Sequence, residues 1–140
     1  MDANTNLREG LTILEPLLAA HGFSLGPIRS GPSSGGPFAS CEFSRGNHRL
    51  QLHFRHSLGL VEYQLGTVTI SHEDLMWSVT GRRWATAYPG FSNAPLDGFK
   101  HLAADLTQYG QDFLAGSDGD FIRHADRVAA LKRDAPRIPQ

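Results

Sequence analysis

The feature that most limits the fold of this chain is an alternation of apolar and polar residues between positions 39 and 70. Side chains alternate between the two faces of a β-strand, so this pattern predicts strands with one apolar face. Two-residue turns at Gly46-Asn47, Ser57-Leu58 and Leu65-Gly66 bring the apolar residues of successive strands onto one face. A slip of one residue would scatter them over both faces. The segment therefore predicts a four-stranded antiparallel meander.

The positions of the turns also predict which residues are cross-strand partners. The second turn places Leu52 opposite Tyr63, and the third places Tyr63 opposite Val68. On the other face, the second turn places His53 opposite Glu62. Side chains that face each other across antiparallel strands interact directly. We therefore expect His53 and Glu62 to form a histidine–carboxylate pair.

The segment before the meander predicts a helix followed by a short strand. Leucines recur at helical spacing over residues 7–21, with Asn6 as the expected helix start. Pro16 lies inside this segment, and we expect it to kink or divide the helix. Residues 23–29 predict a short strand at the edge of the sheet, since they contain Gly and Pro. Residues 30–37 have the composition of a loop.

The segment after the meander predicts three helices. Residues 71–81 predict a short helix with a serine N-cap and a glycine at its end. Residues 82–93 are irregular. Apolar residues at helical spacing then predict a long helix over about 95–115 and a last one over about 119–133. Residues 134–140 predict a frayed tail.

The expected fold class is therefore α+β. We expect two layers: a four- to five-stranded antiparallel meander, covered on one face by the N- and C-terminal helices. The length of 140 residues suits a single domain that spans residues 1–140. The second face of the sheet is left open to solvent.

Composition limits the compartment and the class of partner. Lys and Arg total 13 and Asp and Glu total 14, a net charge of −1 with neutral histidines, which argues against a nucleic-acid binder. The single cysteine, Cys41, suits a reducing compartment. No apolar run reaches the ~20 residues of a membrane span, and the first residues lack the pattern of a signal peptide. We expect a cytoplasmic protein that is not bound to membranes.

The open face of the predicted sheet is the first candidate for a functional surface. It is an ordinary solvated face in one interpretation and a flat recognition surface in the other. The register assigns these residues to it: Ser40, Glu42, Ser44, Arg49, Gln51, His53, Arg55, Leu60, Glu62 and Gln64.

A second candidate surface lies around the end of the short helix. Two tryptophans and two arginines gather there, and both residue types are enriched at binding hot spots. The alternative is that the rings close the edge of the core. Together the two surfaces define the candidate partner-binding residues: Arg49, His53, Arg55, Glu62, Trp77, Arg82, Arg83 and Trp84.

No motif in the sequence supports a catalytic or metal-binding function. Residues 31–35 match G-x-S-x-G, but that motif works at a strand-to-helix turn of a large parallel sheet. Cys41 is expected on the covered face as a buried thiol. His53 and His56 are three residues apart, so a strand would direct them to opposite faces. We predict no catalytic residue, no metal site and no cofactor.

Four segments resemble an uncharacterised family of small bacterial proteins: residues 34–40 (SGGPFAS), 52–61 (LHFRHSLGLV), 71–74 (SHED) and 88–91 (YPGF). The resemblance spans roughly residues 10–116 and implies no particular activity. In size and in the order helix–meander–helix, the chain also resembles immunity proteins, which neutralise toxins of rival bacteria by binding them. That second likeness implies fold rather than function.

Three functional hypotheses follow from these patterns. The first is a non-catalytic protein-interaction module with a protein partner, which could be immunity-like. The second is a small enzyme or ligand-binding domain that uses His53, Glu62 and Arg55 on the open face. The third is a homodimer that covers the open face with its own copy. A concave site on that face would favour the second hypothesis and a flat one the first.

Overall fold

The computed structural model describes residues 3–31, 37–83 and 94–134. It contains an antiparallel sheet and five helices, so the expected α+β fold class is confirmed. The helices are α1 (Ala3–Ala20), α2 (His72–Thr80), α3 (Asp97–Tyr109), α4 (Gln111–Leu114) and α5 (Asp118–Asp134). The strands are β1 (Ser24–Leu25), β2 (Arg29–Gly31), β3 (Phe38–Arg45), β4 (His48–Phe54), β5 (Leu58–Leu65) and β6 (Val68–Ser71).

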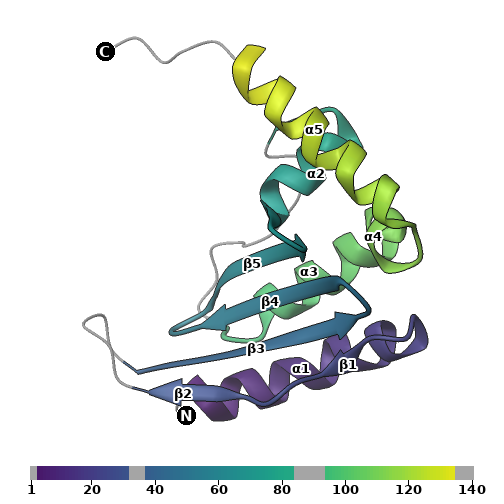
Figure 1. The fold of residues 1–140 in the computed structure, drawn as a ribbon. Coiled ribbons are helices and arrows are strands. Elements are labelled where there is room, and N and C mark those ends of the chain that lie inside the picture. The colour runs from purple at the N-terminus through teal and green to yellow at the C-terminus, as the bar shows by residue number, and fades with distance from the viewer. Residues whose placement is uncertain (1–2, 32–36, 84–93, 135–140) are drawn as a thin grey trace, which may run out of the picture.

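The sheet is covered on one face and open on the other. Its strand order is β1-β3-β4-β5-β6, and β2 pairs with the same edge of β3 as β1 does. Helices α1 and α3 pack against each other behind the strands, and α2 and α5 lie together beyond the β6 edge (Figure 1). The predicted cover of one face by helices from both ends of the chain is confirmed: α1 and α3, the latter within the helix expected over residues 95–115, provide it. Figure 1 thus looks onto the open face of the sheet.

The core lies between the sheet and the two covering helices. The apolar stripe of α1 consists of Leu7, Leu11, Leu14 and Leu18. Each is at most 3% exposed, which agrees with their helical spacing. Gly10 of α1 lies directly against the ring of Phe99 on α3, and a Cβ atom at this position would collide with that ring. Gly10 therefore allows the close approach of α1 and α3.

The register of the meander agrees with the prediction in the first hairpin and differs in the next two. The turn at Gly46-Asn47 is confirmed. Across β4 and β5, however, Leu52 faces Val61, and His53 faces Leu60 rather than Glu62. The predicted pairing of His53 with Glu62 is wrong. The shift amounts to two residues, so each side chain keeps its predicted face and only its partner changes.

Turn chemistry explains the shift in register. A β-bulge between His53 and Phe54 and a connection of residues 55–57 replace the two-residue turn that was expected at Ser57-Leu58. In the third hairpin the turn is Gly66-Thr67, with Gly66 at φ +60° in its first position, as Gly46 is at φ +56° in the first hairpin. Glycine adopts positive φ at little cost, so the glycine decides where the turn begins.

Helix α1 is longer than expected, and it is continuous. It begins at Ala3 instead of Asn6, which lies inside the helix and is buried. It also continues through Pro16 and is not divided there. Pro16 is on the exposed side, where water can bind the carbonyl group that the proline ring leaves unpaired. The expected stop at Gly22 is confirmed, with φ +85°.

The long helix expected over residues 95–115 is divided at Gly110 into α3 and α4. The N–H group of Gly110 donates to the carbonyl oxygen of Leu106 at 2.9 Å, and its own carbonyl accepts from Phe113 and Leu114. A Cβ atom at Gly110 would lie only 2.8 Å from the Leu106 carbonyl oxygen. The glycine therefore ends one helix and starts the next within one turn.

The segments on either side of the meander agree with the prediction in most respects. The strand expected over residues 23–29 is divided into β1 and β2, which lie at the sheet edge as expected. The short helix is confirmed: Ser71 accepts the N–H of Asp74 at 3.2 Å, and Gly81 ends α2 at φ +75°. The residues expected to form the frayed tail lie, beyond Asp134, outside the described part of the chain.

Candidate binding site on the open sheet face

The open face carries rows of side chains that run across neighbouring strands. One row consists of Arg29 on β2, Ser40 on β3, His53 on β4 and Leu60 on β5. The next row along the strands contains Glu42, Gln51 and Glu62, and a third contains Ser44, Arg49 and Gln64. All of them are at least partly exposed, whereas the residues that alternate with them in the middle of β3, β4 and β5, such as Cys41, Leu52 and Val61, are buried. The predicted membership of this face is confirmed for the residues within the strands.

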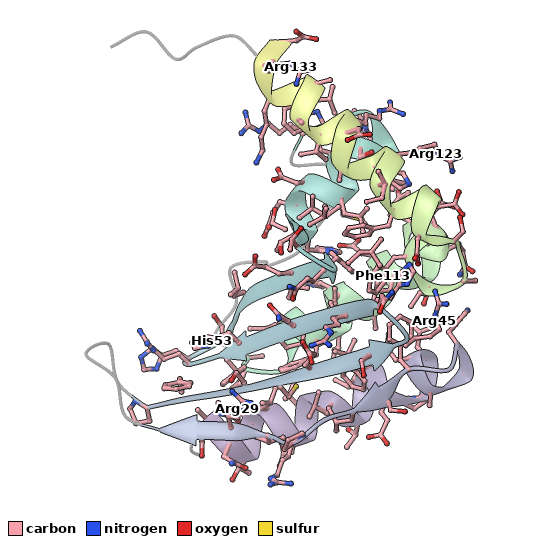
Figure 2. The ribbon with its side chains drawn as sticks, viewed as in Figure 1. Arg29, Arg45, His53, Phe113, Arg123 and Arg133 are labelled. Carbon is pink, nitrogen blue, oxygen red and sulfur yellow. The ribbon has the colours of Figure 1, made fainter. Side chains whose placement is uncertain are left out.

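A hollow of about 370 Å³ lies over this face. One rim is formed by Gly26 and Pro27, between β1 and β2, and Leu60 of β5 lies at the opposite side. Its volume falls in the range of about 300–1,000 Å³ that is typical of ligand sites. Arg29 and His53 lie at this part of the sheet in Figure 2. The face is therefore hollowed, which is the outcome that favours a ligand-binding site over a flat recognition surface.

The charged groups of the hollow are unequally paired. Gln51 donates from Nε2 to Glu42 Oε1 at 3.2 Å and to Gln64 Oε1 at 2.9 Å. Arg49 Nη1 lies 3.5 Å from Glu42 Oε2. The carboxylate of Glu42 is thus engaged by two neighbours. The lining of the hollow contains two guanidinium groups, those of Arg29 and Arg49, and one carboxylate, that of Glu42. No carboxylate in residues 3–31, 37–83 and 94–134 lies within ion-pair distance of Arg29.

The candidate residues of the open face separate into two groups in the structure. Arg49 and His53 line the hollow, and the ring of His53 stacks on Phe38 at 5.2 Å. Glu62 lies one row away, opposite Gln51, and Arg55 is in the connection between β4 and β5; neither lines the hollow. The set of His53, Glu62 and Arg55 considered for an enzyme is therefore not brought together.

Cys41 borders the hollow but has no nucleophilic character. It is 7% exposed, as expected for the covered face. Burial raises the pKa of its thiol to about 12. Because the thiolate is the reactive form, Cys41 is inert at neutral pH.

The aromatic and arginine candidates form a separate surface near α2. Trp77 is only 8% exposed, and the guanidinium of Arg83 lies 4.7 Å from the centre of its ring. Arg82 is exposed. Trp84 lies outside the described residues, as do Tyr88 and Phe91. Trp77 therefore belongs to the structural edge of the core and presents little surface to a partner.

A buried chain of hydrogen bonds that the sequence analysis missed links β5, α2 and α3. His72 Nε2 lies 2.8 Å from Asp105 Oδ2, and His72 Nδ1 lies 2.6 Å from the hydroxyl of Tyr63. The Nε2–H group donates to the carboxylate, so in the neutral ring Nδ1 accepts the Tyr63 hydroxyl proton. Asp105 stands next to Leu106 within the apolar stripe of its helix, which was the available signal.

A second chain has the residue types of a catalytic triad. Ser78 Oγ lies 2.6 Å from His124 Nδ1, and His124 Nε2 lies 2.8 Å from Asp112 Oδ2. A nucleophilic serine must reach its substrate. Ser78 is 0% exposed, so its hydroxyl cannot reach a substrate. The chain of hydrogen bonds instead joins α2, α4 and α5.

A third histidine–aspartate contact joins the sheet to α5. His48 is 3% exposed, and its Nδ1 lies 3.6 Å from Asp118 Oδ1. Its ring packs edge-on against Phe113 and Phe121. Burial lowers the pKa of His48, the charge of Arg45 lowers it further, and the carboxylate of Asp118 acts in the opposite direction. The neutral ring is therefore the favoured form in the folded protein.

The described residues hold no group of three or more His, Cys, Asp or Glu side chains that could ligate a metal ion. Within the same residues, none of the helices combines the length and the apolar character needed to traverse a bilayer. A scan of protein-family models found no match, and neither curated proteins nor solved structures gave a significant one. The fold and the site thus define an α+β domain with a hollowed, polar sheet face.

Proposed function

We propose that this chain is a non-catalytic protein-interaction module that binds its partner through the open sheet face. Concavity alone favours a ligand site, so the observation that carries the proposal is the lining of the hollow of about 370 Å³: Arg29, Arg49 and His53, with the exposed Leu60 at its side. Leu60 is 44% exposed, the larger exposure of the two exposed large apolar side chains in the described residues. Arginine is enriched at the hot spots of protein interfaces, and two arginines line this hollow.

An immunity-like protein that binds and neutralises a toxin in the bacterial cytoplasm is the specific form of this proposal. It rests on the size of the chain and on the order of helix, meander and helices, which is a likeness of architecture. The buried Cys41, which is the single cysteine of the chain, is consistent with a reducing compartment.

Site-directed photocrosslinking tests which face binds the partner. The variants Leu60→Cys and Ile122→Cys place a thiol-reactive benzophenone on the open face and on α5, at the two exposed large apolar residues. Cys41 is buried and inert, so it adds no background labelling. We expect one dominant protein adduct from an extract of the producing cells with Leu60→Cys only, competed by excess unlabelled wild type. Equal adducts at both positions, or none at position 60, would contradict the proposal.

A ligand-binding domain, including a small enzyme, is the second candidate function because the face is concave. The residues available to it are His53, Arg49 and Ser40 rather than the set with Glu62 and Arg55. A small-molecule ligand should raise the unfolding temperature of the wild type and not that of Arg49→Gln. A screen of metabolites by thermal shift distinguishes this function from a protein partner.

A further inference from the structure

We infer that the hollow binds an acidic side chain of the partner protein together with an apolar side chain of the same segment. This inference rests on the proposed function and adds the chemistry of the partner. If the partner binds the open face without using a carboxylate, this inference is wrong and the proposed function remains.

The first argument is the balance of charge in the hollow. Glu42 is held by Gln51 and lies within 3.5 Å of Arg49, so it neutralises at most one of the two arginines. Arg29 has no carboxylate within ion-pair distance among the residues that the structure describes. Glu62, the other carboxylate of this face, lies one row away opposite Gln51 and outside the lining, so the excess of positive charge belongs to the hollow itself. A partner carboxylate is the complementary group.

The second argument is the arrangement of polar and apolar groups along one row. Arg29 is at the outer end of the row, the hydroxyl of Ser40 follows, and Leu60 is at the inner end. His53 lies between Ser40 and Leu60, with its ring stacked on Phe38. A carboxylate at the arginine end would accept hydrogen bonds from the guanidinium and hydroxyl groups. Arg29 and Leu60 are three strand spacings apart, roughly 14 Å at about 4.8 Å per strand, so an apolar side chain further along the same partner segment would cover the exposed part of Leu60.

A pair of synthetic peptides tests this chemistry directly. One peptide carries two glutamates flanked by leucines, and the other carries glutamines in their place. Titration into the isotope-labelled protein should move the amide signals of Arg29, Ser40, His53 and Leu60 with the glutamate peptide. The glutamine peptide should bind about tenfold more weakly or worse, since a charge-assisted hydrogen bond is lost.

Two variants test the site, and a third is the control. Arg29→Gln and Arg49→Gln should each weaken binding of the glutamate peptide by about tenfold. Arg133→Gln, at the far end of α5 in Figure 2, should leave it unchanged. Unchanged circular dichroism spectra show that the variants fold. Equal binding of both peptides, or equal binding by wild type and Arg29→Gln, would overturn the inference.

The remaining outcomes separate the possible occupants of the hollow. Sodium acetate that moves the same signals as strongly as the peptide would show a site for free carboxylates, and would overturn the assignment to a protein segment. A dimer seen by light scattering that dissociates in Arg29→Gln would make a second copy the occupant, with the same effect. If the Leu60→Cys adduct persists with both arginines replaced, the inference fails and the proposed function stands. Loss of that adduct in the folded variant supports both.

Discussion

The imidazole Nε2 of His72 lies 2.8 Å from the carboxylate Oδ2 of Asp105, and both residues are buried. The pair connects the first residue of α2 to the middle of α3. A buried polar group is costly when it loses its partner. The contact therefore makes the attachment of α2 to the core depend on two side chains that are far apart in the sequence.

Replacing Asp105 by alanine should lower the free energy of unfolding by about 1–3 kcal/mol, because the His72 N–H is left buried without its acceptor. Urea denaturation monitored by tryptophan fluorescence measures the change. Asp126→Ala, at an exposed position of α5, is the matched control and should change stability by less than about 0.5 kcal/mol. Equal stability of the two variants would show that the His72–Asp105 contact contributes nothing.

The stability of the fold should decrease in mild acid because of His48. Its pKa is lowered in the folded protein, so below the unfolded value of about 6.5 the unfolded state binds more protons. Stability is thus complete above that pH and is lost as the pH falls towards the folded pKa. Urea midpoints at pH 8 and pH 5.5 should differ less in His48→Gln than in the wild type. An identical pH dependence in both proteins would exclude this role of His48.

The start of α5 should depend on a reciprocal pair of hydrogen bonds between Ser117 and Asp120. The Ser117 N–H donates to Asp120 Oδ2 at 2.9 Å, and the Asp120 N–H donates to Ser117 Oγ at 3.3 Å. Ser117→Ala should cost about 1 kcal/mol, as is usual for loss of an N-cap. The hydrogen bond from Ser117 also lowers the pKa of Asp120. Its contribution is therefore present at neutral pH and lost as strong acid protonates the carboxylate; thermal melts at pH 7 and pH 3 check both points.

Gly10→Ala should destabilise the protein by about 1–3 kcal/mol, because the added methyl group collides with the Phe99 ring between α1 and α3. Gly119→Ala in α5 provides the control. Its Cβ would meet only Ser117 Oγ at 3.7 Å, an ordinary contact, and alanine favours the helix. We expect opposite changes in melting temperature from the same substitution at these two helical glycines.

The face of each strand residue could be predicted from the sequence, and its cross-strand partner could not. The alternation of apolar residues assigned Tyr63 to the core and Gln64 to the open face, and both assignments are confirmed. A register shift by two residues preserves that alternation, so hydrophobicity cannot detect it. The bulge after His53 and the positive φ of Gly66 decided the register instead.

The histidine–aspartate contacts could not be predicted from the sequence either, because they also depend on how distant segments pack. His124 and Asp112 lie on different helices, and no local pattern in the sequence relates them. Their contact arises from the way α4 and α5 pack, and its partner Ser78 comes from α2. Contacts between helices depend on their relative placement, for which no local pattern exists.

The local sequence by itself determined the α+β class, the sheet with one apolar face, and the helix ends marked by Ser71, Gly22 and Gly81. These features depend on hydrophobic periodicity and on backbone preferences, which act within a few residues. Tertiary structure alone decided that the open face is hollowed and that Arg29 joins Arg49 and His53 there. Arg29 lies on β2, whereas Arg49 and His53 lie on β4. They meet only through register and edge pairing, and each of those is set by contacts between distant parts of the chain.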